Sequence, residues 1–189
     1  MATARILLLL LCTTPAFGYW LPHRHLLSAP QAYARAEHIS HTDSTAGAVQ
    51  RIIMLAEQQL MVRELRGQND GVAVESYLRY VGLGKGHAWC AAFVSWLHGQ
   101  LGYAQPRSGW SPALFPASRR ISTARAGAIL GIYLPSWKRI AHVGLVSGAR
   151  KDWVASIEGN TNPAGSREGD GVYRRMRHRR AIHHYAFFL

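Results

Sequence analysis

The chain has 189 residues, enough for one domain with a buried core, and it contains only 2 cysteines. Its 22 lysines and arginines outweigh 10 acidic residues, which gives a formal net charge of +12. This composition excludes a disulfide-rich scaffold and an acidic disordered chain, and it favours polyanionic surroundings such as nucleic acid, an anionic membrane or an acidic cell envelope.

The first residues are typical of a secretory signal peptide over residues 1–18. Arg5 supplies the positive start, and the apolar run from Ile6 to Cys12 is too short to span a bilayer. The small residues Ala16 and Gly18 stand at the −3 and −1 positions of a cleavage site. Cleavage would remove Cys12 and leave Cys90 unable to form an internal disulfide, so we expect a secreted or periplasmic, envelope-associated protein; an uncleaved membrane anchor is the alternative.

Residues 19–44 lack periodicity and are expected to form a flexible N-terminal segment, in which scattered histidines are solvated rather than metal-binding. From there to residue 189 we predict one domain, 45–189. A helix capped by Asp43 or Ser44 should run to about Arg66, followed by a second short helix that includes Val74 to Val81.

Residues 87–97 predict a buried helix that begins near Cys90 and ends at Gly99 and Gly102. A thiol in the first turn of a helix lies beside unpaired N–H groups and the positive end of the helix dipole, which favour the thiolate. Free cysteines are more often small buried hydrophobes, so this segment alone leaves both interpretations open.

The following segment, 105–120, is interpreted as a long ordered loop in which Trp110 lines a groove or simply packs. After Gly127 the pattern changes to five strands separated by turn signals: 128–134, 140–147, 153–158, 172–178 and 182–188. Short connections predict antiparallel neighbours, so the whole chain predicts an α+β fold, helices first and an antiparallel sheet second.

Two strands carry polar residues at positions where a core would be apolar. Alternation places Ile140, His142 and Gly144 on one strand face, and the glycine leaves room for a group to approach the imidazole. Glu158 and Asn160 share a face at the end of the next strand, where either side chain could accept the imidazole N–H. Each residue has an ordinary structural interpretation, but the set together with Cys90 points to a thiol hydrolase.

The chain resembles the CHAP branch of the NlpC/P60 superfamily of bacterial peptidoglycan hydrolases. The resemblance is carried by three motifs in order, Trp89–Trp96, Ala141–Val146 and Ile157–Asn162, and it covers roughly residues 48–189. It implies a papain-like α+β fold in which N-terminal helices pack on the antiparallel sheet. The acid that usually opens the strand before the histidine is missing, since Ala126-Gly127-Ala128 stands there.

The resemblance implies a catalytic set of Cys90 as nucleophile, His142 as general base, Glu158 as the residue that orients the imidazole, and Asn160 at a fourth polar position. Trp89 and Trp110 are our candidates for substrate binding. No cofactor or metal is expected, and the calcium-holding acidic loop of some relatives is not evident. The expected reaction is hydrolysis of peptidoglycan as an endopeptidase or an N-acetylmuramoyl-L-alanine amidase through a thioester.

The expected partners are peptidoglycan or its stem peptides and the anionic envelope, with the basic run Arg174–Arg180 forming a solvated edge that faces the envelope. We expect a monomer and no specific nucleic acid. The competing hypotheses are a catalytically weak wall-binding module of the same fold and a basic nucleic-acid-binding protein.

Overall fold

The computed structural model describes residues 44–164 and 169–189. The predicted signal peptide, which contains Cys12, lies outside the described residues, and so does nearly all of the predicted flexible segment. In the described part of the chain three α-helices come first, α2 (Thr45–Gln58), α3 (Val72–Tyr80) and α4 (Cys90–Gln100). Within this part of the chain, no helix is long and apolar enough to cross a bilayer.

Six antiparallel strands follow and form one sheet in the order β1-β6-β2-β3-β4-β5. They are β1 (Arg120–Ile121), β2 (Ile129–Leu134), β3 (Arg139–Arg150), β4 (Trp153–Thr161), β5 (Gly171–His178) and β6 (His184–Ala186). The short 3-10 helices η1 (Ser111–Leu114), η2 (Ala117–Arg119), η3 (Pro135–Trp137) and η4 (Arg179–Ala181) lie in the connections. The predicted α+β class and all five predicted strands are confirmed, whereas β1 was not predicted.

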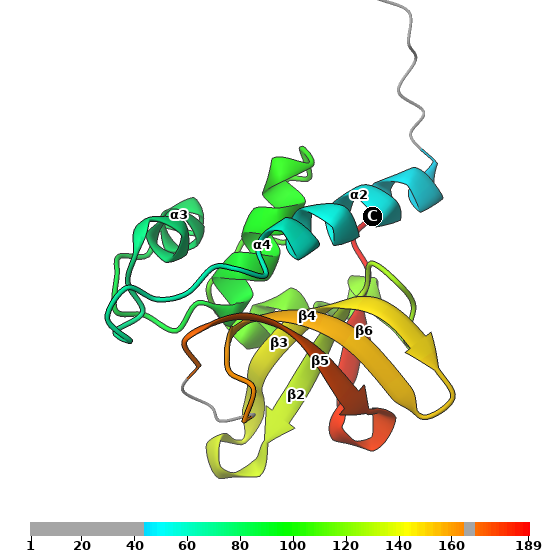
Figure 1. Cartoon of the computed structure of the whole chain (residues 1–189). Coiled ribbons are helices and arrows are strands. Elements are labelled where there is room, and N and C mark those ends of the chain that lie inside the picture. Colours follow the sequence, from blue (N-terminus) through cyan, green and yellow to red (C-terminus); the bar gives the residue numbers. More distant parts are fainter. Residues whose placement is uncertain (1–43, 165–168) are drawn as a thin grey trace, which may run out of the picture. The chain divides into compact units, whose positions relative to one another are not determined.

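The helices cover one face of the sheet, as Figure 1 shows for α2 and α4. The α4 residues Phe93, Val94 and Leu97 are fully buried in a cluster with sheet residues such as Leu145 and Ile157. Because α4 is apolar on nearly every side, it can be enclosed by α2, α3 and the sheet. A smaller cluster, which includes Leu130, Val146, Val154 and Ile182, fills the other face of the sheet.

The first helix ends earlier than predicted. Ser44 caps α2 by accepting from the Gly47 N–H at 3.3 Å, as expected, but the helix ends at Gln58 rather than near Arg66. The next residues pair instead with the β5 end: the Val172 N–H donates to the Val62 carbonyl, and the Glu64 N–H donates to the Asp170 carbonyl. Tertiary pairing thus overrides the helix propensity of this segment.

Two other local predictions were wrong. Gly99 does not end α4, which continues to Gln100; a Cβ at Gly99 would lie 2.2 Å from the Tyr80 ring, so this glycine permits close contact with α3. The short β5–β6 connection does not make those strands neighbours, because β6 lies between β1 and β2. Ile182, in the connection between β5 and β6, packs in the cluster with Val154.

Candidate active site

Cys90 is the first residue of α4, and its side chain is 5% exposed. The N-cap residue Trp89 makes no side-chain capping hydrogen bond, and the N–H groups of a first helical turn have no intrahelical partner. The sulfur lies 3.6 Å from the Ser111 hydroxyl, the first residue of η1. Among the described residues Cys90 is the free cysteine.

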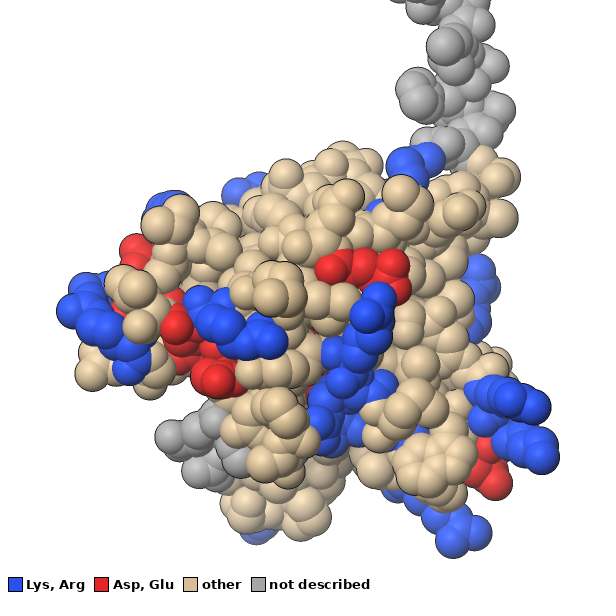
Figure 2. Space-filling model, viewed as in Figure 1, with Lys and Arg blue, Asp and Glu red and all other residues tan. Residues whose placement is uncertain are grey.

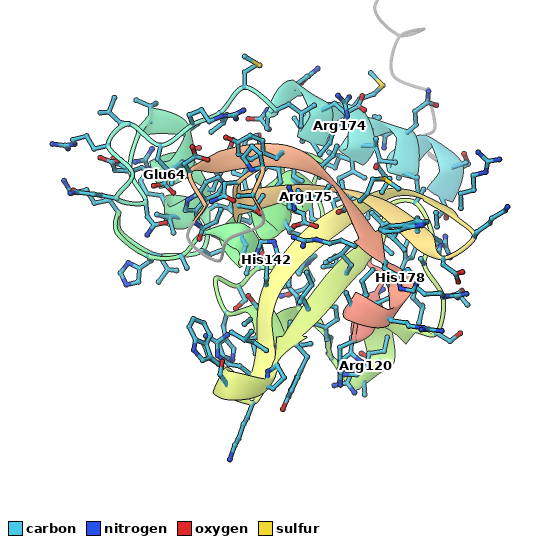
Figure 3. All side chains as sticks on the ribbon, turned by 60° about the horizontal axis from the view of Figure 1, so that its bottom comes forward. Glu64, Arg120, His142, Arg174, Arg175 and His178 are labelled. Carbon is cyan, nitrogen blue, oxygen red and sulfur yellow. The ribbon has the colours of Figure 1, made fainter. Side chains whose placement is uncertain are left out.

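His142 of β3 faces Cys90, and its other side is fixed by Glu158. The Nε2 atom lies 2.8 Å from Glu158 Oε2, which leaves Nδ1 as the nitrogen available to the thiol. Gly144 makes this possible, because a Cβ there would lie 2.5 Å from the Glu158 Cγ. The predicted room beside His142 therefore exists, and the Glu158 side chain fills it. In Figure 3 the His142 label lies below β5.

The bulge in the β2–β3 pairing corrects one part of the predicted alternation. Ile132 pairs with His142 but Tyr133 pairs with Ile140, so Ala141 is the extra residue. Ile140 consequently joins the helix-side cluster with Val143, while His142 and Glu158 contact each other across the opposite side of the strands. The imidazole nevertheless interacts with Cys90 at the start of α4.

The thiol and the imidazole each favour the charged form of the other. Burial raises the pKa of the Cys90 thiol, but the hydrogen bond and charge of His142, with help from Ser111, outweigh this effect and lower it. Burial lowers the pKa of His142, and the interactions with Cys90 and Glu158 reverse that effect and raise it. The arrangement therefore favours a thiolate–imidazolium pair.

Glu158 is fully buried and its carboxylate is the centre of a hydrogen-bond network. The Ser156 hydroxyl donates to Oε1 at 2.7 Å. Arg177 of β5 donates to both oxygens, from Nε to Oε1 at 2.9 Å and from Nη2 to Oε2 at 2.6 Å. Burial raises the pKa of this carboxyl, but Arg177 and His142 together hold it well below its usual range.

Arg177 was not recognised in the sequence, because it belongs to the run that we interpreted as a solvated edge. β5 is an edge strand, but its arginines are mostly engaged. Arg174 pairs with Glu57 of α2 at 2.8 Å, and Arg175 donates to the carbonyls of Asn162 and Pro163 at 3.1 and 2.7 Å. Figure 3 shows Arg174 toward α2 and Arg175 on the side nearer His142. The β4–β5 register pairs Glu158 with Tyr173 and Arg177 with Val154, so the long arginine side chain reaches along the sheet to the carboxylate.

Asn160 does not contact the imidazole; it holds the start of α4. Its Oδ1 accepts from the Trp89 N–H at 2.9 Å, and its Nδ2 donates to Asn69 Oδ1 and to the Gly169 carbonyl at 3.2 and 3.1 Å. The irregular β4–β5 register after Glu158 and the positive φ of Asn160, 54°, turn this side chain away from His142. It is thus a positioning residue and not a direct partner of the base.

The prediction that Trp89 binds substrate is wrong. Its indole is fully buried between Tyr77 and Phe93, and its Nε1 donates to Glu64 Oε1 at 2.8 Å. Trp89 directly precedes Cys90, the first residue of α4. Its buried ring therefore anchors the start of this helix in the core. Trp110, the other candidate, is 54% exposed at the start of η1.

Cys90 and His142 open into a cleft of about 540 Å³. Its lining combines polar side chains, among them Glu64, Asn160 and Asp170, with apolar ones such as Trp137 and Leu134. Asn69 also lines the cleft, and its Nδ2 donates to the Gly86 carbonyl at 3.4 Å. Between residues 44 and 164 and from 169 onward, no group of three acidic, histidine or cysteine side chains could hold a metal ion.

No protein-family model matches the chain, and no curated protein matches it significantly. Among solved structures the chain is similar to the crystal structure of Ly7917, with a TM-score of 0.45 and 17% identity over 74% of this chain and 61% of that one. It is also similar to Ly7917 with the hydrolyzing product of MDP, with a TM-score of 0.45 and 15% identity over 74% and 62%. The chain spans less than two thirds of both, so the function proposed below rests on the site itself.

Proposed function

We propose that the protein is a cysteine-dependent hydrolase of peptidoglycan with a papain-like domain over residues 45–189. The observation that carries this proposal is the chain of contacts from Cys90 through His142 to Glu158 at the mouth of a cleft. A thiol at a helix start, a base beside it and a carboxylate that orients the base are the parts that nucleophilic acyl transfer requires.

The reaction follows from these positions. The Cys90 thiolate attacks an amide carbonyl, and the Cys90 N–H at the start of α4 stabilises the oxyanion. His142 then protonates the leaving amine, so the C–N bond breaks and a thioester remains. His142 deprotonates water for the second attack, which releases the acid and restores the thiol. The Ser111 hydroxyl, 3.6 Å from the sulfur, can donate to the thiolate but cannot accept from it.

The substrate and location are proposals that rest on the sequence. The three motifs resemble those of wall hydrolases, residues 1–18 have the pattern of a secretory signal peptide, and the charge of +12 suits an anionic envelope. N-terminal sequencing of the protein recovered outside the cytoplasm tests the export step. A start at Tyr19 is expected, and recovery only inside the cell with Met1 or Ala2 retained would contradict it.

Alkylation of Cys90 by iodoacetamide across pH tests the nucleophile. We expect rapid labelling to persist well below the pKa of an ordinary thiol, about 8.5, because His142 stabilises the thiolate. His142→Gln should move the labelling midpoint up toward that value. Slow labelling with an ordinary thiol profile in the wild type would instead support the wall-binding module without catalysis.

Digestion of purified peptidoglycan, followed by mass spectrometry, tests the reaction and identifies the bond. Wild-type protein should release fragments, whereas Cys90→Ala should release none and keep the wild-type melting temperature. Fragment release by Cys90→Ala at the wild-type rate would exclude the mechanism. A new free amine on alanine would indicate the amidase bond, and a new terminus inside the stem peptide would indicate an endopeptidase.

A further inference from the structure

Arg139, at the start of β3, lies between two tryptophans that come from different loops. Its guanidinium carbon is 4.1 Å from the ring centroid of Trp110 and 4.6 Å from that of Trp137. Its Nη1 also donates to the Ile140 carbonyl at 2.9 Å. Two cation–π contacts and a hydrogen bond therefore fix the position of a partly buried cation. We call Trp110, Arg139 and Trp137 the aromatic–arginine platform.

The platform adjoins the catalytic cleft. Trp137 lines the cleft with Cys90 and His142, and β3 carries Arg139 three residues before His142. Both indoles remain well exposed, Trp110 at 54% and Trp137 at 42%. Most aromatic rings of this size bury their area in a core, so two ordered, exposed rings beside a reactive thiol are suited to contact a ligand.

The chemistry of the platform defines the ligand class. An indole face packs well against the apolar C–H face of a pyranose ring, and it carries no requirement for a particular hydrogen-bond pattern. Guanidinium N–H groups recognise carboxylate and acyl oxygens, and a cation held among rings is poorly hydrated and so binds an anion more strongly. A sugar ring that carries a carboxylate, or an ether-linked substituent ending in a carboxyl group, presents both features.

We propose that the aromatic–arginine platform is a subsite for an acidic N-acetylated sugar whose carboxylate, free or amide-linked, faces Arg139. The proposal rests on the peptidoglycan hydrolase function proposed above and deepens it. A sugar bound at Trp137 places its acyl substituent at the cleft that contains Cys90. The platform therefore favours cleavage of the amide next to the sugar over cleavage deep in the stem peptide.

Equilibrium binding to the Cys90→Ala protein tests the subsite without turnover. The probes are N-acetylmuramic acid, neutral N-acetylglucosamine, an N-acetylmuramoyl dipeptide and the same dipeptide without sugar, followed by tryptophan fluorescence and calorimetry. We expect the sugar-bearing dipeptide to bind more tightly than the bare dipeptide, and the acidic sugar more tightly than the neutral one. Trp110→Ala and Arg139→Gln should each raise the dissociation constant for the acidic sugar about two- to tenfold.

Trp153→Ala is the matched control, because Trp153 is 49% exposed but lies at the start of β4 and does not line the cleft. In the Cys90→Ala background, the Trp153→Ala variant should bind the acidic sugar with the same dissociation constant as the Cys90→Ala protein itself. The subsite would be overturned if the sugar-bearing and the bare dipeptide bound equally well, or if a short oligothymidylate bound more tightly than the acidic sugar. It would also be overturned if Trp153→Ala weakened binding of the acidic sugar as much as Trp110→Ala does. If peptidoglycan is not cleaved but the predicted order of affinities is found, the subsite stands and the proposed reaction fails.

Discussion

The single residues around His142 have two kinds of role. Some determine the charge and orientation of the imidazole, and others hold Cys90 in position next to it. Glu158 accepts from Nε2, and Arg177 neutralises much of the same carboxylate through two short hydrogen bonds. Glu158 therefore orients the ring, while Arg177 limits how far the carboxylate raises the basicity of the imidazole. Asn160 and Trp89 act one step further away, since both fix the start of α4 on which Cys90 stands.

This division predicts opposite pH shifts for two substitutions. The Glu158 carboxylate favours the imidazolium, so Glu158→Gln should lower the pKa of His142. The imidazolium attracts the anionic reagent iodoacetate, so the alkaline limit of rapid Cys90 alkylation by iodoacetate should move to lower pH. Arg177→Gln should raise the pKa of His142 and move the same limit upward. If the alkaline limit moved in the same direction in both variants, this would contradict the interpretation that Arg177 partly neutralises the Glu158 carboxylate.

Both substitutions break a buried ion pair, which typically costs about 3–5 kcal/mol of folding free energy. Thermal melts should therefore accompany the alkylation profiles, at temperatures where each variant is folded. Ser156→Ala is a useful control, because it removes a donor to Glu158 but leaves the charge of the network unchanged. Its alkylation limit should stay closer to that of the wild type than either charge variant does.

At the scale of elements, α4 joins the site to the core and carries a second histidine. His98, fully buried, donates from Nδ1 to the Val94 carbonyl at 2.9 Å, and its Nε2 has no hydrogen-bond partner among the described residues. Tyr103 and Phe188 pack against the ring at centroid distances of 6.4 and 5.9 Å. Burial lowers the pKa of His98 to about 4.

A buried neutral histidine makes folding sensitive to acid. The unfolded chain binds a proton near pH 6.5, whereas the folded chain binds it only near pH 4, so the free energy of unfolding falls as the pH drops between these values. His98→Leu should remove this dependence. Between pH 7.5 and 5 the wild type should lose about 2 kcal/mol more than the variant does, measured by urea unfolding. Parallel losses in the two proteins would show that His98 does not titrate in this way.

The same scale shows what the sequence could predict. The helix α4, which is apolar on nearly every side, and the apolar strand β3 were predicted because local runs of buried residues determine them. The end of α2 and the Ala141 bulge depend on strand register, and the Arg177–Glu158 contact depends on a side chain that reaches along the sheet, and one sequence encodes neither in a readable pattern. Cys90, His142 and Glu158 were identifiable, whereas Ser111 and Trp137 come from irregular connections with no such signal.

At the scale of the whole molecule, the net charge of +12 is not gathered into one basic patch on the face that Figure 2 shows. Figure 2 shows basic side chains scattered over the face in view, several beside acidic ones. The run that concentrates arginines is partly neutralised: Arg174 pairs with Glu57, Arg177 with Glu158, and Arg179 lies 3.7 Å from Asp152. Exposed pairs contribute little to stability, but they reduce the charge that a polyanion meets.

Attraction to an anionic wall should therefore depend on total charge more than on β5. Arg174→Gln with Arg180→Gln removes two charges at this edge, and Lys85→Gln with Arg125→Gln removes two at exposed positions elsewhere. In the Cys90→Ala background, both double variants should lose similar fractions of binding to purified wall in co-sedimentation, and added salt should weaken all three proteins, because charges beyond about 10 Å are screened at 0.1 M. A several-fold greater loss for the β5 pair would instead identify that edge as the contact surface.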